Sequence, residues 1–339
     1  MTADPHCPAL SRRTRAALVA GAMLLGACGR APVPRPPAPQ SGLSSERVQV
    51  LALDSGVTAT AVAPQRLDPQ KRVELILYAL PNGNSTAQTM GRTLTDGMDW
   101  HFDIQHIGAQ TRALRARGLS NAIVVYLEAD TKSWPEWRRL RGYENANARI
   151  VAMVDRVRAA VGNPPGMSVT LTGHSGGGSF FWGFIDGQNA LPDWLKRIAF
   201  LDANYSFEPR HGEKIAAWLR GNERNTLVVM AYDDRNIMLD GKRVITDSTG
   251  GTWRASQRMM DYFRPSFALT TGTLGGFVRY RGTQIDFLLH PNPANRILHT
   301  EMIGEMNGYM HAMLVRRPDY EAGESVLRPM RAYREWIEP

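Results

Sequence analysis

Apolar runs bounded by turn residues alternate with amphipathic stretches along most of the chain. Three of these runs are almost continuously apolar, at 73–80 (VELILYAL), 122–127 (AIVVYL) and 226–231 (TLVVMA). Such runs are typical of strands that are covered on both faces of a sheet. Helical periodicity in the intervening stretches predicts an α/β fold with a mostly parallel central sheet and helices on both faces.

The same pattern predicts further elements around these strands. A strand pair is predicted at 47–53 and 57–62, and single strands at 168–171, 197–201, 284–290 and 296–303. Helices are predicted at 102–117, 145–161, 180–185, 212–219, 253–263 and 310–315. The last two strands flank Pro291-Asn292-Pro293, which suggests a hairpin at that point.

The N-terminus has the pattern of an export signal. Arg12, Arg13 and Arg15 precede an apolar stretch at 16–27, which is too short to span a bilayer. The sequence Leu25-Gly26-Ala27-Cys28 that follows resembles the bacterial lipobox, in which the cysteine thiol receives diacylglycerol. We therefore expect residues 1–27 to be a lipoprotein signal peptide. Cys28 is then the site of lipidation, and the lipid anchors the protein to a membrane of the bacterial cell envelope.

A proline-rich segment follows the expected anchor. Residues 28–46 begin CGRAPVPRPPAPQ, a composition that favours extended polyproline II structure and serves as a semi-rigid spacer. We expect one catalytic domain over residues 47–339, facing the periplasm or the cell surface from the outer membrane.

Composition narrows the classes of function. The formal net charge is +8, but the arginines are scattered and no nucleic-acid-binding motif is present. Once the leader is removed, Cys28 is the only cysteine, so neither an intramolecular disulfide nor a cysteine metal site is expected. We expect no metal and no organic cofactor.

The strongest chemical motif lies in the middle of the chain. Gly173-His174-Ser175-Gly176-Gly177 matches G-x-S-x-G, between a predicted strand and a predicted helix. A serine on such a sharp turn needs small neighbours two residues before and after it, because the turn brings these positions close to adjacent backbone. Across roughly residues 47–335 the arrangement resembles the α/β-hydrolase family. The resemblance implies that Ser175 is a nucleophile and that the Gly176 N–H faces the oxyanion.

The resemblance also implies an acid and a base, in the chain order Ser, Asp or Glu, His. Asp234 follows the strand at 226–231 and fits the spacing of the family's acid best. Asp233 and Asp202 remain open as alternatives.

His311 follows the last predicted strand and is the expected base. His299 falls inside the strand predicted at 296–303, where a structural role is expected. The elbow is expected to turn His174 away from the site. Asn84, in the loop after the strand at 73–80, is the candidate for the second oxyanion donor.

Together these features predict a serine hydrolase acting on a small or polymeric carboxylic ester through an acyl-enzyme. A peptidase or amidase with the same triad is the alternative within enzymes. A catalytically silent binding module of the envelope is the alternative outside them. The short segments at 186–196 and 235–250 are the expected rim elements, so an open site without a large lid is expected.

Overall fold

The computed structural model describes residues 46–54, 56–321, 325–328 and 330–339. The signal peptide, Cys28 and almost all of the proline-rich linker lie outside the described residues. In the part of the chain that is described, no helix is long and apolar enough to cross a membrane.

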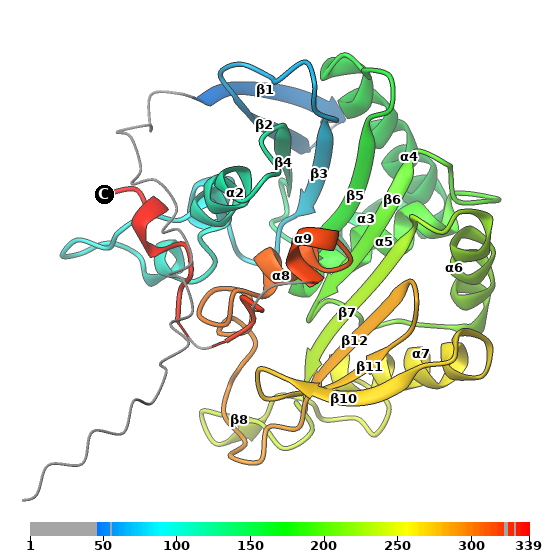
Figure 1. Cartoon of the computed structure of the whole chain (residues 1–339). Coiled ribbons are helices and arrows are strands. Elements are labelled where there is room, and N and C mark those ends of the chain that lie inside the picture. Colours follow the sequence, from blue (N-terminus) through cyan, green and yellow to red (C-terminus); the bar gives the residue numbers. More distant parts are fainter. Residues whose placement is uncertain (1–45, 55, 322–324, 329) are drawn as a thin grey trace, which may run out of the picture. The chain divides into compact units, whose positions relative to one another are not determined.

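A ten-stranded sheet organises the described residues (Figure 1). Its strand order is β1-β2-β4-β3-β5-β6-β7-β12-β11-β10. The strands are β1 (Glu46–Asp54), β2 (Val57–Pro64), β3 (Glu74–Ala79), β4 (Ala122–Ala129), β5 (Ser168–His174), β6 (Leu195–Leu201), β7 (Thr226–Tyr232), β10 (Thr270–Leu274), β11 (Phe277–Arg281) and β12 (Ile285–His290). The six strands from β4 to β12 pair in parallel, whereas β1, β2, β10 and β11 pair antiparallel at the two edges.

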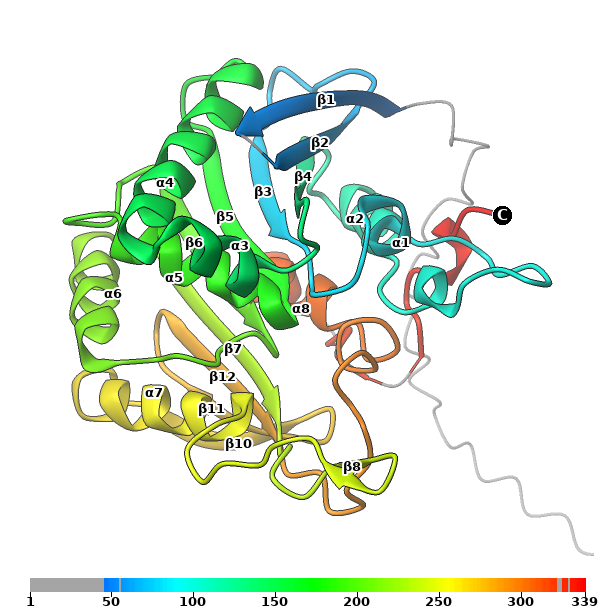
Figure 2. The ribbon, with the colours of Figure 1, turned by 180° about the vertical axis from the view of Figure 1, so that it is seen from behind.

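Helices cover both faces of this sheet (Figures 1 and 2). The helices are α1 (Thr86–Met90), α2 (Ile107–Ala116), α3 (Trp134–Arg141), α4 (Tyr143–Ala160), α5 (Gly178–Asp186), α6 (Pro209–Gly221), α7 (Thr252–Phe267), α8 (Gly308–Leu314) and α9 (Pro318–Glu321). Buried residues of α3 to α7 form one core with one face of the sheet, and those of α2 and α8 form a second core with the other. The predicted α/β class is confirmed.

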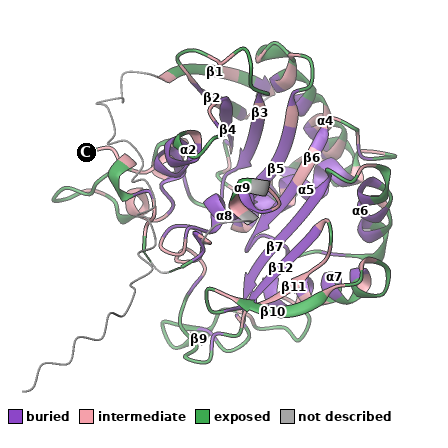
Figure 3. Cartoon of the chain, viewed as in Figure 1, coloured by how far each residue is buried: buried purple, intermediate pink, exposed green. Residues whose placement is uncertain are grey.

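Burial explains why the central strands could be predicted from the sequence. Every residue of β7 is buried, and β3 and β4 are nearly so, because helices pack on both of their faces (Figure 3). The edge strand β10 (TTGTL) is mostly exposed and was not predicted, since its sequence is polar. The neighbouring strand β11 (FVRYR), which is interrupted by two arginines, was not predicted either.

Two predicted elements differ from the structure. The helix predicted from residue 102 begins only at Ile107, because His106 has a left-handed backbone with φ of 50°. The strand predicted at 296–303 is wrong: residues 291–307 form a loop of turns. Asn292 starts this loop with a positive φ, and its side chain bonds the backbone N–H and carbonyl of Arg296, closing a turn.

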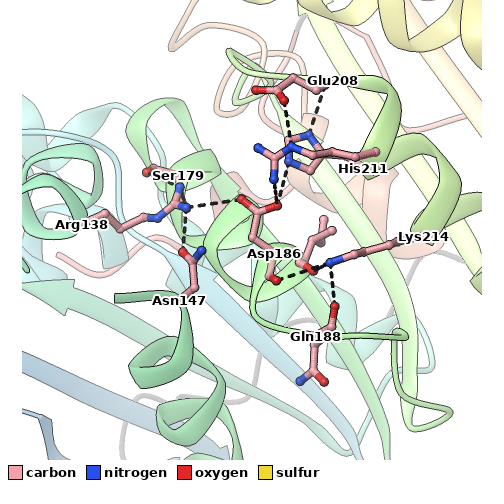
Figure 4. Close-up of polar contacts among 10 residues, drawn as sticks. Arg138, Asn147, Ser179, Asp186, Gln188, Glu208, His211 and Lys214 are labelled. Atoms are coloured by element: carbon pink, nitrogen blue, oxygen red, sulfur yellow. Dashed lines mark hydrogen bonds and ion pairs between the residues drawn. The ribbon is translucent and has the colours of Figure 1, made fainter. Parts of the chain in front are cut away.

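Asp186, at the end of α5, binds α3 and α6 directly and is linked to α4 through Arg138 (Figure 4). Its carboxylate lies 3.7 Å from Arg138 on α3 and 3.0 Å from Nε2 of His211 on α6. Arg138 also donates to Asn147 on α4 at 2.7 Å. Burial alone would raise the pKa of Asp186, but His211, Arg210 and Arg138 outweigh it and hold the pKa below its usual range.

Replacing Asp186 should therefore destabilise the fold. In Asp186→Ala the guanidinium of Arg138, with a side chain only 7% exposed, loses its countercharge. We expect a loss of about 2–3 kcal/mol in the free energy of unfolding, measured by urea denaturation. Glu136→Ala is the control, since it removes an exposed ion pair with Arg139 and should leave the urea midpoint unchanged. Equal midpoints for the two variants would contradict the role given to Asp186.

Candidate active site

Ser175 occupies the sharp turn between β5 and α5. The strand ends at His174, Ser175 has a φ of 53°, and a short 3-10 turn over Ser175–Gly177 leads into the helix. A left-handed backbone is costly for a residue with a side chain and is found at functional sites, where the surrounding structure imposes it. This is the backbone geometry that the G-x-S-x-G motif predicts.

The glycines of the motif are required by close packing. A Cβ atom at Gly173 or at Gly177 would overlap the carbonyl oxygen of Ala79 on β3. A Cβ atom at Gly178 would overlap the carbonyl oxygen of Ala203. The elbow therefore fits between β3 and the loop after β6 only because these positions carry no side chain.

The loop after β3 approaches the elbow through Asn82. The amide of Asn82 fills the space that a Cβ atom at Gly176 would need. Asn84, the expected oxyanion donor, is buried and donates its backbone N–H to the Pro81 carbonyl at 3.4 Å. The side chain next to Gly176 is therefore that of Asn82, and the buried Nδ2 of Asn84 has no hydrogen-bond partner among the described residues.

Asp202 and His299 form a hydrogen-bonded pair. Nδ1 of His299 is bonded to one carboxylate oxygen of Asp202, and the hydroxyl of Thr252 donates to the other. Asp202 is fully buried and has a φ of 47°, whereas a quarter of the His299 side chain is exposed. A carboxylate on Nδ1 favours the tautomer whose Nε2 is free to accept a proton.

Strand register brings this pair next to Ser175. His174 at the end of β5 pairs with Leu201 at the end of β6, so Ser175 and Asp202 follow on neighbouring parallel strands. Backbones of such strands are about 4.8 Å apart. The ring of His174 lies against that of His299, with centroids 4.2 Å apart, so His174 does not turn away from the site. Burial lowers the pKa of His174 well below its usual range and keeps this ring neutral.

Tyr205, three residues beyond Asp202, reaches back to the elbow. Its hydroxyl lies close enough to Ser175 to interact with it, although 39% of the residue is exposed. The loss of water around the hydroxyl and the nearby charge of Asp202 raise the pKa of Tyr205 well above that of a free tyrosine. Tyr205 therefore remains protonated at neutral pH.

The two other candidate acids have different partners. Asp234 is buried and accepts the backbone N–H of Thr252 at 2.9 Å, at the start of α7. Its burial and the charge of Asp202 raise the pKa of Asp234 to about 6. Asp233 binds Arg235 through both carboxylate oxygens, at 2.8 and 2.6 Å. The carboxylate that meets a histidine at this edge of the sheet is Asp202.

His311, the expected base, lies in another cluster. It is fully buried on α8, its Nδ1 shares a 2.8 Å hydrogen bond with the Tyr320 hydroxyl, and its Nε2 lies 3.8 Å from Asp286. Arg279 binds both oxygens of that carboxylate.

Strand register shows how far this cluster is from Ser175. One row across four strands joins His174, Leu201, Met230 and Leu288. Ser175 follows the first residue of the row, whereas Asp286 precedes the last by two residues. Because three strand spacings separate β5 from β12, Ser175 and Asp286 lie about 14 Å apart across the sheet. The choice of His311 as base therefore disagrees with the structure, because its carboxylate partner sits near the amino end of β12 and Ser175 sits beyond the carboxyl end of β5.

His299 was missed because the apolar residues around it resemble a strand. Pro291, Asn292, Pro293 and Asn295 precede it, and this density of turn formers is the signal that predicts a loop instead. A histidine in a loop after the last parallel strand can reach the carboxyl edge of the sheet, where loops carry functional residues.

The strand order and the strand–serine–helix turn are those of the α/β-hydrolase fold. No model of a known protein family matches this sequence, and no curated protein matches it.

Several solved structures resemble the chain at low identity. One is a cold-adapted esterase from an Arctic intertidal metagenomic library, with 13% identity over 73% of this chain and 83% of the other, at a TM-score of 0.35. Another is poly(aspartic acid) hydrolase-1 from Sphingomonas sp. KT-1, with 16% identity over 65% of this chain and 85% of the other, at a TM-score of 0.39. A third is a feruloyl esterase module from Clostridium thermocellum, with 11% identity over 76% of this chain and 87% of the other, at a TM-score of 0.39. These proteins have hydrolase names, but likenesses this distant do not establish an activity for this chain.

The raised pKa of Asp234 predicts an unusual pH dependence of stability. The folded protein holds the proton of Asp234 up to about pH 6, against a reference pKa of 3.8, so its ionisation at neutral pH is destabilising. Asp234→Asn should therefore gain stability relative to the wild type as pH rises from 4.5 to 7.5, by about 2 kcal/mol. The measurement is urea denaturation at both pH values.

Asp233→Asn is the matched control, for which the change in stability with pH should have the opposite sign. Burial alone would raise the pKa of Asp233, but its bonds with Arg235 outweigh burial and lower the pKa. Its charge therefore stabilises the fold above the unfolded pKa, and the variant should lose stability at pH 7.5 but much less at low pH. The same pH trend in both variants would contradict this account.

Proposed function

We propose that this chain is a serine hydrolase that cleaves a carboxylic ester, with Ser175 as nucleophile, His299 as base and Asp202 as acid. The observation that carries the proposal is the hydrogen bond between His299 and Asp202, one strand away from a serine in a left-handed turn. A hydrogen-bonded carboxylate–imidazole pair beside a strained serine is the recurring arrangement of nucleophilic acyl transfer.

The proposed reaction begins at Nε2 of His299. This nitrogen takes the hydroxyl proton as Ser175 Oγ attacks the ester carbonyl, and Asp202 stabilises the imidazolium that forms. We assign stabilisation of the oxyanion to the N–H of Gly176, at the start of a helix, and to the side-chain NH₂ of Asn82 beside it. His299 then protonates the departing alcohol. Water, activated by the same imidazole, releases the acid from Ser175.

Labelling with a fluorophosphonate tests the three roles directly, since the reagent phosphonylates activated serines without needing the natural substrate. We expect Ser175 to be modified in the wild type and Ser175→Ala to be inert. His299→Ala should react at least 100-fold more slowly, because general-base catalysis contributes on that order.

His311→Asn is the control for the choice of histidine. It should retain labelling within a few-fold, with its folding verified by circular dichroism. Loss of labelling in His311→Asn together with retention in His299→Ala would reverse the assignment. A panel of p-nitrophenyl acyl esters and peptide anilides then reports the bond cleaved, and turnover of the anilides alone would replace the esterase by an amidase.

We also propose that the mature protein is a bacterial envelope lipoprotein anchored through Cys28. Support comes from the complete match of residues 25–28 to the lipobox and from the proline-rich segment after it. Because acyl chains contribute about 0.8 kcal/mol for each CH₂ group buried, a multi-chain anchor holds firmly.

Cys28→Ala tests this anchor. The wild type should float with membranes in a density gradient and incorporate labelled palmitate. The variant should do neither and should be found in soluble fractions. Full membrane association of the variant, or palmitate on it, would contradict the proposal.

A further inference from the structure

Thr252 lies between two buried carboxylates at the edge of the proposed active site. It is the first residue of α7, and its hydroxyl donates to one oxygen of Asp202. Its backbone N–H donates to Asp234 at 2.9 Å, and its hydroxyl oxygen is 3.4 Å from the same carboxylate oxygen. Asp202 and Asp234 follow neighbouring strands of the sheet, so one threonine connects the ends of β6 and β7.

We propose that Thr252 and Asp234 are positioning residues for the acid–base pair: Thr252 fixes the carboxylate of Asp202, and Asp234 fixes Thr252 and adds its negative charge beside the pair. This inference rests on the proposed function, because it assigns Asp202 and His299 the roles of acid and base.

Hydrogen-bond stoichiometry supports this division of roles. A threonine hydroxyl has one proton, and its shorter contact directs that proton to Asp202. One oxygen of Asp202 is thus occupied by Thr252 and the other by His299, which leaves the carboxylate little freedom to rotate. From Thr252, an ionised Asp234 can then accept only the backbone N–H, and this bond holds the threonine in place.

The role of Asp234 as a helix cap accounts for only part of this geometry. A carboxylate on the first N–H groups of a helix is a common stabilising contact. Capping does not require the Thr252 hydroxyl to meet Asp202, nor a cap carboxylate to be buried. One oxygen of Asp234 is buried and has no hydrogen-bond partner among the residues that the structure describes. Packing at Gly251 is also tight, since a Cβ atom there would lie 2.5 Å from the Asp234 carboxylate.

Several titratable groups surround the two carboxylates. The groups electrostatically coupled to Asp234 are Asp202 at the end of β6, Tyr205 in the following loop, Tyr232 on β7 and Arg235 beside it in the chain. Arg235 is exposed and is bound to Asp233, so it offsets little of the Asp234 charge. His299 and the neutral His174 face Asp202 from the other side. The imidazolium that forms during catalysis is therefore stabilised by two carboxylates and not by one.

A pair of Thr252 variants tests the hydrogen bond. The readout is the second-order rate constant of fluorophosphonate labelling, measured on the full-length chain in detergent. Thr252→Val keeps the shape and the backbone N–H but removes the hydroxyl, and we expect about a tenfold lower rate constant, the order expected for one lost hydrogen bond. Thr252→Ser restores the hydroxyl and should react within twofold of the wild type. Wild-type rates in the valine variant, or equal losses in both variants, would overturn the role of Thr252.

The pH profile of labelling tests the charge of Asp234. Asp234→Asn keeps an acceptor for the Thr252 N–H but removes the charge. With one negative charge fewer, protonation of the base is less favourable, so the acid limb of the profile should move to lower pH by on the order of half a unit. Asp233→Asn, the neighbouring carboxylate that is paired with Arg235, should leave the limb in place. An unmoved limb in Asp234→Asn, or equal shifts in both variants, would overturn the role of Asp234.

Failure of this inference is distinguishable from failure of the proposed function. If Ser175 in the wild type is not labelled, or Ser175→Ala is labelled as fast as the wild type, the serine-hydrolase proposal fails. If Ser175 is labelled normally while the Thr252 and Asp234 variants behave as the wild type, only the positioning roles fail. Circular dichroism spectra of all variants should match the wild type. If the valine variant does not fold, Thr252→Ser and the pH profile of Asp234→Asn still test the positioning roles.

Discussion

The bond between the carboxylate of Asp202 and the imidazole of His299 is the contact on which the proposed site depends. It joins the end of β6 to a loop that follows β12, nearly a hundred residues later in the chain. Without this bond nothing described in the structure would select a tautomer for His299, and a neutral imidazole can present either nitrogen as the acceptor. The fully buried carboxylate therefore orients a partly exposed ring, which is the arrangement a base needs when its other nitrogen must meet a substrate.

The sheet supplies the rigidity that this contact requires. Parallel pairing of β5 with β6 places Ser175 and Asp202 side by side just beyond the ends of adjacent strands, and helices pack on both faces of these strands. The elbow is held equally firmly, because Gly173 and Gly177 both press against Ala79. The same packing places two carboxylates near each other. Burial and the negative charge of Asp202 raise the pKa of Asp234 to about 6. Crowded carboxylates of this kind are typical of functional sites, where stability is lost to hold charges in place.

The sequence was sufficient for the parts of the molecule that depend on local pattern. Fully buried strands such as β7 leave an unbroken apolar run, and the turn at Ser175 leaves glycines where the packing excludes any side chain. The base and the acid depend on tertiary contacts instead. Leu298, Met302 and Ile303 are buried because a loop folds back over the second core, so their apolar character suggested a strand around His299. The choice of Asp202 over Asp234 likewise depends on which carboxylate binds His299. The spacing of residues along the chain does not determine this contact.

The most direct measurement of the central claim is a crystal structure of the protein after reaction with a fluorophosphonate. We expect phosphorus bonded to Ser175 Oγ, with Nε2 of His299 within hydrogen-bond distance of Oγ and Nδ1 of His299 on Asp202. The phosphoryl oxygen should accept the N–H of Gly176. An adduct on another residue, or an adduct on Ser175 whose nearest imidazole is not His299, would contradict the account.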